Sequence, residues 1–206
     1  MTQTRPYAGV DAADRLARRR ARLLESGLEL LGSNVDPAEL TVRGICQQSG
    51  LATRYFYESF ADKEVFIAAV FDAVAAQLAT TTQAAVAAAP PEEQTRAGLM
   101  NIVRTAEADP RIGRLIFGAQ VSNTTVVRKR LEIEALFVML AGQHVETLTE
   151  QPATEGTKAF SYFVVGGVTQ TISAWLVGDL TMTSNELVER LSAIIEAFRE
   201  SSLFRG

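Results

Sequence analysis

Residues 41–63 carry side chains whose types and spacing suit contacts with DNA. The sequence predicts two short helices there, about 42–49 and about 53–59, separated by a turn at Gly50. A helix, a glycine-containing turn of three or four residues and a second helix describe a helix-turn-helix. Such a unit lays its second helix in the DNA major groove, which is wide enough for an α-helix. An ordinary helical hairpin would more often carry Leu, Ala and Glu where this second helix presents Thr53, Arg54, Tyr55 and Tyr57.

This stretch resembles the N-terminal domain of the TetR family of transcriptional regulators. The family's pattern is a Thr-Val pair, then a turn glycine before an aliphatic residue. An aromatic pair and Tyr-x-x-Phe come next, and a lysine opens the fourth helix. These types occur here as Thr41-Val42, Gly50-Leu51, Phe56-Tyr57, Phe60 and Lys63. There are two departures. The loop 32–40 is slightly long, and Ala52 replaces the usual Ser or Thr cap, so we expect Thr53 to cap the helix instead.

The resemblance implies a role for each matching residue. Thr41 is expected to contact a phosphate at a helix N-terminus, where backbone N–H groups point outward. Arg54 is the residue expected to read a guanine, because its planar fork matches the O6 and N7 atoms. Tyr57 and Lys63 are expected to hold phosphates, with core packing as the alternative for the Tyr57 ring. Contacts in the major groove or at its flanks are expected for Arg43, Thr53, Arg54 and Tyr55.

The charge of the chain is unevenly distributed. The net charge is −4, which by itself argues against binding a polyanion. Residues 1–24, however, contain six arginines and only two acidic residues, Asp11 and Asp14. Cations near the start of a helix are disfavoured by the helix dipole, so helix stability does not explain the four arginines at positions 18, 19, 20 and 22. We expect them to steer DNA phosphates, with a solvated helix face as the alternative.

Several classes of protein are excluded by composition. The single Cys46 leaves no disulfide within the chain and no cysteine cluster, and the single His144 leaves no multi-histidine metal centre. Cys46 is expected to fill the core, whereas His144 is either structural or a ligand contact. No metal and no cofactor are predicted. The start of the chain has no apolar signal segment and no run approaches the roughly 20 apolar residues that span a bilayer, so we expect a cytoplasmic protein without a membrane partner.

Helical periodicity recurs from end to end, and strand patterns are nearly absent. The sequence therefore predicts an all-α fold of about nine helices, with a DNA-binding domain over residues 1–61 and a helical ligand-binding and dimerisation domain over residues 62–206. Asp11 or Asp14 is expected to cap the first helix, which Gly32 ends. The other helices are expected at about 63–82, 92–108, 111–121, 125–149 and 155–177, with a last one capped by Ser184. Helix 63–82 is apolar on most sides and should run through the centre.

The last two helices are unusually apolar for a surface pair. One copy of the chain could bury one stripe from each, which would leave a second face exposed. Pairing two copies as a four-helix bundle covers that face, and the family resemblance implies such a homodimer. Packing within a single chain is the alternative. The residues expected at the dimer interface are Phe163, Gly167, Trp175, Leu187, Leu191, Ile194 and Phe198.

The middle helices combine apolar side chains with a few polar groups, which suits a lipophilic small ligand. The family resemblance implies a pocket between them, and ordinary core packing is the alternative for most of its residues. The residues expected to line it are Met100, Val103, Phe117, Gln120, Phe137, Leu140 and His144.

The sequence thus predicts a ligand-responsive regulator rather than an enzyme. It would be a homodimeric repressor that leaves a palindromic DNA operator when a small lipophilic effector binds. Helix 63–82 begins at the DNA-facing Lys63 and enters the apolar body, so we expect it to transmit that effect. Two alternatives stay open. An all-helical enzyme could use the pocket, although one histidine and one cysteine nearly a hundred residues apart make no evident catalytic pair. A purely architectural dimer would have no cavity.

Overall fold

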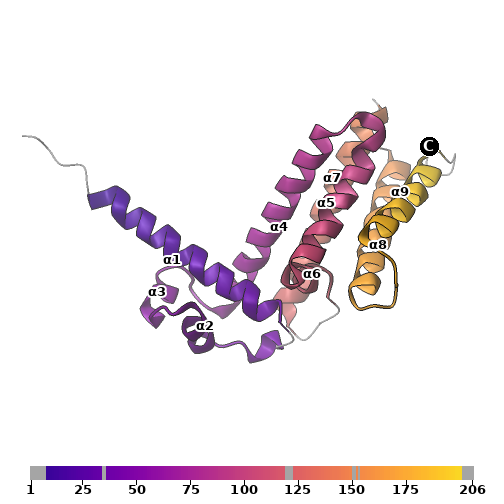
Figure 1. The fold of residues 1–206 in the computed structure, drawn as a ribbon. Coiled ribbons are helices and arrows are strands. Elements are labelled where there is room, and N and C mark those ends of the chain that lie inside the picture. Colours follow the sequence, from indigo (N-terminus) through magenta and orange to yellow (C-terminus); the bar gives the residue numbers. More distant parts are fainter. Residues whose placement is uncertain (1–7, 34–35, 119–122, 150–151, 153, 201–206) are drawn as a thin grey trace, which may run out of the picture.

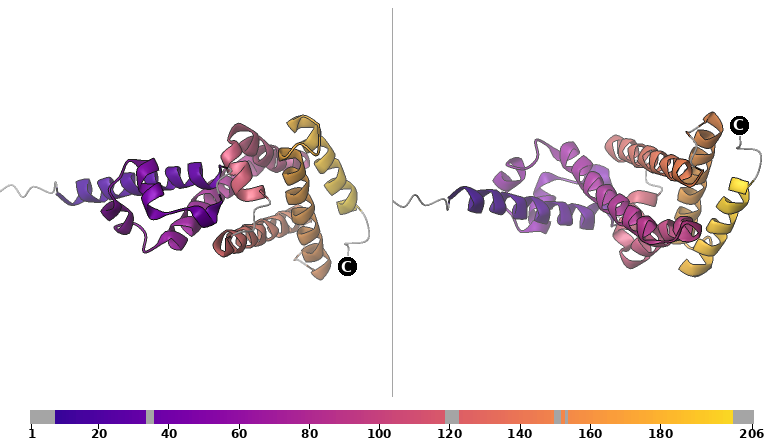
Figure 2. Two further views of the ribbon diagram at one scale, coloured as in Figure 1. Left: turned by 90° about the horizontal axis from the view of Figure 1, so that it is seen from below. Right: turned by 90° about the horizontal axis from the view of Figure 1, so that it is seen from above.

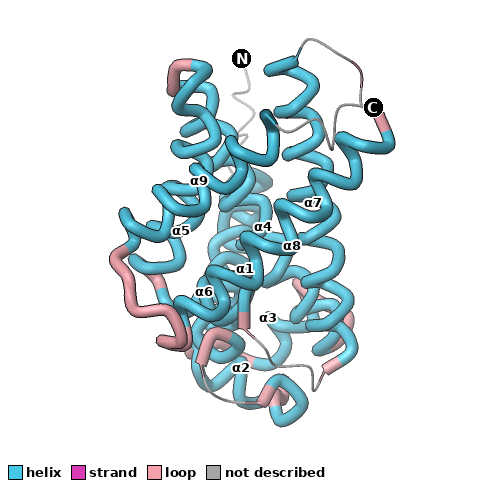
Figure 3. The backbone as a smooth tube through the Cα atoms, turned by 90° about the vertical axis from the view of Figure 1, so that its right-hand side faces the viewer, coloured by secondary structure: helices cyan, strands magenta, loops and turns pink. Residues whose placement is uncertain are grey.

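The computed structural model describes residues 8–33, 36–118, 123–149, 152 and 154–200. Within these residues every regular element is helical (Figures 1 and 3), which confirms the predicted all-α fold of about nine helices. Two short 3-10 helices, η1 (Pro37–Glu39) and η2 (Pro91–Glu93), lie between longer ones. The α-helices are α1 (Ala8–Leu31), α2 (Val42–Ser49), α3 (Thr53–Tyr57), α4 (Lys63–Ala88), α5 (Gln94–Ala108), α6 (Pro110–Phe117), α7 (Thr124–Thr149), α8 (Glu155–Leu176) and α9 (Ser184–Glu200).

The molecule is elongated, with α1, α2 and α3 at one end and α9 at the other (Figures 1 and 2). Helix α4 contacts α1 at the first end and α5, α6 and α7 in the body. Helix α8 packs on α6 and α7, whereas α9 packs on α5. One buried cluster contains residues from both sides of position 62, including Phe56 and Phe66. The division into domains 1–61 and 62–206 stays a prediction.

Most helix boundaries follow from local capping. The Oγ1 atom of Thr41 accepts a hydrogen bond from the Gly44 amide at 3.1 Å, and a carboxylate oxygen of Asp62 accepts one from the Val65 amide at 2.8 Å. These side chains satisfy amide groups that the first turn of a helix leaves without partners. Gly50 ends α2 with φ of 65°, a conformation that glycine adopts without strain.

Three predicted caps are wrong. Helix α1 begins at Ala8, so Asp11 and Asp14 lie inside it. Helix α3 starts after Ala52 with no side-chain cap, so Thr53 does not take over that role. Helix α9 is capped by Thr183 rather than Ser184.

The Thr183 cap is reciprocal: its hydroxyl oxygen accepts from the Glu186 amide at 3.2 Å, and the Glu186 carboxylate accepts from the Thr183 amide at 2.8 Å. This reciprocal pair satisfies two amides at once, which explains why it displaces the single serine. Two helix ends also differ from prediction. Helix α4 continues to Ala88, well beyond Thr82, and α6 ends at Phe117.

Helix α4 is apolar on most sides, as predicted, and eight of its residues are buried. By length and composition α4 could span a membrane. The expectation that no run is apolar enough to span a bilayer is therefore wrong. Half of its most apolar window is buried inside this protein, against helices from both ends of the molecule. The apolar character of α4 is therefore accounted for by its place in the core.

Three phenylalanines join α3 and the turn after it to α4. The ring centroids of Phe56 in α3 and Phe66 in α4 lie 5.5 Å apart, and Phe60 lies 5.6 Å from Phe56 and 5.1 Å from Phe66. All three rings are buried. Tilted and edge-to-face arrangements at these separations are favourable beyond the burial of the rings themselves. The orientation of α3 is thus set by the first turn of α4.

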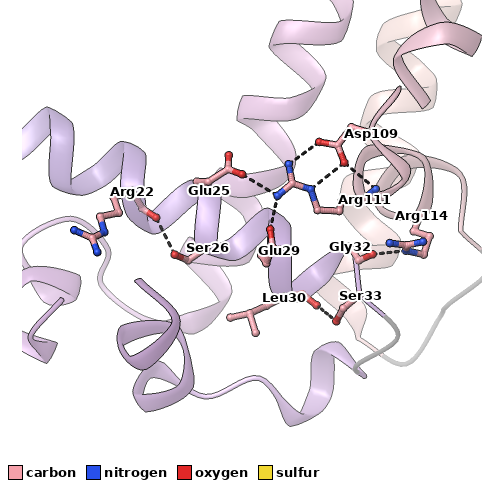
Figure 4. A network of polar contacts seen from close by, with 10 residues as sticks. All are labelled: Arg22, Glu25, Ser26, Glu29, Leu30, Gly32, Ser33, Asp109, Arg111 and Arg114. Atoms are coloured by element: carbon pink, nitrogen blue, oxygen red, sulfur yellow. Dashed lines mark hydrogen bonds and ion pairs between the residues drawn. The ribbon is translucent and has the colours of Figure 1, made fainter. Parts of the chain in front are cut away.

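A polar contact joins α1 to α6 directly (Figure 4). At the start of α6, the Nη1 atom of Arg111 donates to Glu25 at 2.8 Å and also to Glu29, both on α1. Its Nη2 atom donates to Asp109 at 2.7 Å. These hydrogen bonds from Arg111 hold the pKa of Asp109 below its ordinary value. The Arg111 guanidinium therefore ties α1 to α6 by a route separate from α4.

Helices α1 and α4 approach each other closely at Gly27. A Cβ atom there would lie 2.5 Å from the Cγ2 atom of Val70 and 2.6 Å from the Cζ atom of Phe66. Both neighbours are fully buried and have no space to move into. Only glycine allows this spacing between the two helices.

We expect Gly27→Ala to lower the free energy of unfolding by about 1–3 kcal/mol, because the added methyl group overpacks the core. Gly142→Ala is the matched control in a helix interior, where the new Cβ would lie 3.6 Å from the Ser161 hydroxyl, an ordinary contact. That change should raise stability by about 0.5–1 kcal/mol. Urea unfolding of the two variants measures both effects. Equal stability of the two variants would show that the close approach at Gly27 is not rigid.

Candidate nucleic-acid interface

Helices α2 and α3 form the predicted helix-turn-helix around Gly50. The amide of Gly50 donates to the Gln47 carbonyl oxygen at 3.3 Å, and the amide of Leu51 donates to the Cys46 carbonyl oxygen at 3.1 Å, which closes the turn. Cys46 is buried in the core, so its predicted role as a core filler agrees with its position. Both helices pack on α1.

The residues predicted to contact DNA lie around this unit, and most are open to solvent. Thr41, Arg43, Thr53 and Arg54 are exposed at or near the starts of α2 and α3. Tyr57 is 57% exposed, and the edge of its ring packs against Phe56 at 5.4 Å. Its phenol group can therefore reach a phosphate while one side of the ring stays on the protein.

Four of the predicted contact residues, Thr41, Arg54, Tyr55 and Lys63, make hydrogen bonds within the chain. The Lys63 ammonium group donates to the Ala38 carbonyl oxygen at 3.4 Å and lies 4.0 Å from the Glu64 carboxylate. The Tyr55 hydroxyl accepts a hydrogen bond from the Arg54 Nη2 atom at 2.5 Å. The ring of Tyr55 also lies 4.3 Å from the guanidinium carbon of Arg19 and 4.6 Å from that of Arg54. Tyr55 is accordingly only partly exposed.

Two arginines of α1 make contacts within the chain that the sequence did not predict. The Arg19 Nη2 atom donates to the Glu58 carboxylate at 3.2 Å. The Arg20 Nη1 atom donates to the Ser59 carbonyl oxygen at 3.3 Å, and its guanidinium lies over Phe60. Glu58, the only acidic residue between positions 41 and 60, was the available sequence signal for this contact. These two arginines hold the helix-turn-helix against α1, a role that differs from the phosphate contact and from the solvated helix face.

The residues predicted to line a ligand pocket are spread over the body. Val103 is fully buried in a core cluster with Leu99 and Ile172, which corrects its assignment to a pocket wall. Phe117 and Phe137 are partly buried and pack on the core, and Leu140 is partly exposed. Gln120 lies outside the described residues.

Two open hollows lie elsewhere on the body. One, of about 480 Å³, is on α7 and is lined by residues such as Val127 and Leu131. The other, of about 470 Å³, lies between α4 and α5 and includes Met100 from the predicted set, beside Arg96 and Arg104. Neither hollow brings the predicted pocket residues together.

His144 is half-buried on α7, and its Nε2 atom is buried without a hydrogen-bond partner. Burial lowers the pKa of His144, and the positive charge of Arg199 lowers it further, although Glu196 acts in the opposite direction. The imidazole is therefore neutral at pH 7. A neutral, partly apolar ring in the body suits either of its predicted roles, structural or ligand contact.

The residues predicted for a dimer interface divide into two groups. Leu187 and Leu191 are 1% and 6% exposed and pack on α5 and α8 within the chain, so they belong to its own core. The predicted interface is wrong at these two positions because the apolar stripe of α9 is wide, and part of it is buried in the core of its own chain. The Trp175 indole N–H donates to the Met182 carbonyl oxygen at 2.8 Å, and the ring packs on the same core.

The second group stays at the surface. Phe163 and Ile194 are 55% and 51% exposed, and Gly167 has open space where a side chain would be. The rings of Phe163 and Phe198 lie 5.2 Å apart in an edge-to-face arrangement that joins α8 to α9. An exposed group of large apolar side chains on two adjacent helices is typical of a surface that another protein covers. The dimer itself stays a prediction.

The fold and this site define an all-helical protein with a helix-turn-helix near its N-terminus. No protein-family sequence model matches the chain, and no curated protein is significantly similar to it in sequence. Solved structures are similar in fold: the chain has the fold of the TetR-family transcriptional regulators, as the resemblance in residues 41–63 implied.

A TetR-family transcriptional regulator from Streptomyces coelicolor matches with a TM-score of 0.69 at 16% identity, over 92% of this chain and 87% of that one. The fatty acid degradation regulator FadR from Bacillus halodurans matches with a TM-score of 0.72 at 14% identity, over 94% and 96% of the two chains. FadR from Bacillus subtilis, solved in complex with stearoyl-CoA, matches with a TM-score of 0.71 at 14% identity, over 85% and 96%.

The exposed group on α8 and α9 generates a prediction about assembly. We expect Phe163→Glu to halve the mass of the protein in solution to the 22.3 kDa of one chain, because a charge would be buried in the interface. Val177→Glu, at an apolar position that is 69% exposed beyond the end of α8, is the control and should leave the mass unchanged. Sedimentation equilibrium measures both. A wild-type mass of 22.3 kDa would contradict the dimer.

Proposed function

We propose that this protein is a cytoplasmic, homodimeric regulator of transcription that binds a palindromic DNA operator through α2 and α3. It acts as a repressor, and a small lipophilic effector bound in the body releases it from DNA. The observation that carries the proposal is the set of exposed side chains at the starts of α2 and α3, above all Arg54, on a helix whose other side is anchored by the buried Phe56.

The chemistry of this surface fits the major groove. Arg54 offers a planar fork that can donate two hydrogen bonds to a guanine, and Thr53 beside it can donate to or accept from a base edge. Hydroxyl and ammonium groups that can bind phosphates beside the groove are offered by Thr41, Tyr57 and Lys63. These contacts fix the position of the protein on the duplex, whereas contacts with bases select the sequence.

Two copies are required for a palindrome, and the exposed apolar group on α8 and α9 supports this pairing. It lies at the end of the molecule opposite α3 (Figure 2), so pairing there would leave both reading helices uncovered. In a binding-competent dimer the two reading helices would be about 34–36 Å apart, one turn of DNA.

A lipophilic effector is supported by the composition of the body. The middle helices contain Phe117, Phe137, Leu140 and His144, three apolar side chains and one polar group. One structure with this fold, the Bacillus subtilis FadR, holds an acyl-CoA. We therefore propose an effector with a long acyl chain. The three similar structures named above are transcriptional regulators, and the proposed activity requires neither a catalytic residue nor a cofactor.

Binding to DNA from the region beside its own gene tests the function. We expect specific binding that weakens steeply with salt, because phosphate contacts release counterions. Arg54→Ala should cost about 1–3 kcal/mol and relax the preference at one base position. Lys63→Ala should instead weaken binding to all sequences alike and reduce the salt slope by about one. Gel-shift titrations at several salt concentrations measure both variants. The absence of specific binding even at low salt would refute the proposal.

The effector generates a separate prediction. We expect stearoyl-CoA to bind more weakly when operator DNA is present, by the same factor by which it weakens operator binding, because coupling between two sites is reciprocal. Calorimetric titration with and without operator gives the two affinities, and free coenzyme A is the control for the polar part of the ligand. Equal affinities in the two titrations would show that the sites are uncoupled.

A further inference from the structure

The reading helix α3 has few interactions of its own that stabilise its helical conformation. It contains five residues, and its N-cap residue Ala52 offers no side-chain hydrogen bond. Isolated helices of this length are unstable in water, because the first turn fixes several residues for a single hydrogen bond. Phe56 anchors one side of α3 in the core. Another contact must fix the side that carries Tyr55 and Glu58.

Arg19 of α1 makes that contact. Its Nη2 atom lies 3.2 Å from the Glu58 carboxylate, and its guanidinium carbon lies 4.3 Å from the centroid of the Tyr55 ring. Tyr55 and Glu58 are three residues apart, so their side chains lie next to each other on the same face of the helical turn. The Arg19 side chain is 26% exposed, and its Nε atom is buried. A mostly covered guanidinium of this kind has little surface left to meet a DNA phosphate.

Because Tyr55 also contacts Arg54, fixing the Tyr55 ring restricts the Arg54 side chain. The Tyr55 hydroxyl accepts from the Arg54 Nη2 atom at 2.5 Å, and the Arg54 guanidinium lies 4.6 Å from the same ring. An exposed arginine normally samples many rotamers, and this freedom is lost when it binds a base. An arginine already held near one orientation loses less freedom on binding.

We propose that Arg19 is a positioning residue for sequence reading: through Tyr55 and Glu58 it fixes the reading helix and, with it, the Arg54 guanidinium. The inference rests on the proposed DNA-binding function. It assigns Arg19 a different role from the phosphate contact that the sequence predicted for the arginines of α1. Arg104, an exposed arginine on α5 in the body, serves as the comparison.

The side-chain chemistry separates these two roles. A guanidinium is planar, so it can stack on a phenol ring and donate to a carboxylate at the same time, whereas an ammonium group cannot reproduce both contacts. A phosphate contact, in contrast, needs mainly the positive charge. Arg19→Lys therefore keeps what a phosphate contact requires and removes what a positioning contact requires.

The experiment measures the binding of the full chain to operator DNA and to a scrambled duplex of the same length, by fluorescence anisotropy at several salt concentrations. We expect Arg19→Lys to weaken operator binding about five- to ten-fold, the size of one stacking contact. Binding to the scrambled duplex and the salt slope should stay as in the wild type. Arg104→Lys, at an exposed position on α5, should leave all three quantities unchanged. Tyr55→Phe, which keeps the ring and removes the acceptor for Arg54, should also lower the preference for operator DNA.

The effects of Arg19→Lys and Tyr55→Phe should be less than additive, because both act on Arg54. Two results would overturn the positioning role and leave the proposed function standing. One is that Arg19→Lys binds operator DNA as tightly as the wild type does. The other is that Arg19→Gln binds both duplexes more weakly by the same factor, with a salt slope reduced by about one. A wild-type protein that does not distinguish the two duplexes would overturn the proposed function and this inference together. Circular dichroism of each variant verifies that the helical fold is intact.

Discussion

The contact of Phe66 with Phe56 and Phe60 is the interaction on which the rest of the structure depends. It joins the reading helix α3 to the first turn of α4, and α4 is in turn the helix that contacts α1, α5, α6 and α7. Because interiors are close-packed, a shift of α4 by even a small amount would have to move α3 or open a void. The direction in which α3 points is therefore a property of the whole helical body rather than of the helix-turn-helix alone.

Around this apolar contact, α1 supplies the polar half of the support. Its arginines contact α3 and the turn that follows, while Glu25 and Glu29 at its far end bind Arg111 of α6. One helix thus contacts both the reading unit and the body by ion pairs that salt weakens. High salt would loosen these internal contacts.

The sequence was sufficient for several helix ends whose causes are local, although the caps predicted at Asp11 or Asp14, Thr53 and Ser184 are wrong. Thr41, Gly50 and Asp62 mark helix ends by rules that involve only their immediate neighbours, and the structure has the ends where those rules place them. The partners of Arg19 and Arg20 could not be predicted, because they depend on how α1 crosses α3. Likewise, periodicity identified the stripe of α9 but not which side it faces. Leu187 and Leu191 face the chain's own core, whereas Ile194 faces outward.

The position of Trp175 has a spectroscopic consequence. It is the only tryptophan in the chain, and its indole N–H is bonded to the Met182 carbonyl oxygen, between the end of α8 and the start of α9. Tyr55 and Tyr57, in contrast, lie on the reading helix. The absorbance of the phenols combines these two with Tyr162 on α8, so it does not report on α3 alone. Emission from the single indole, in contrast, follows the environment of the body without a label.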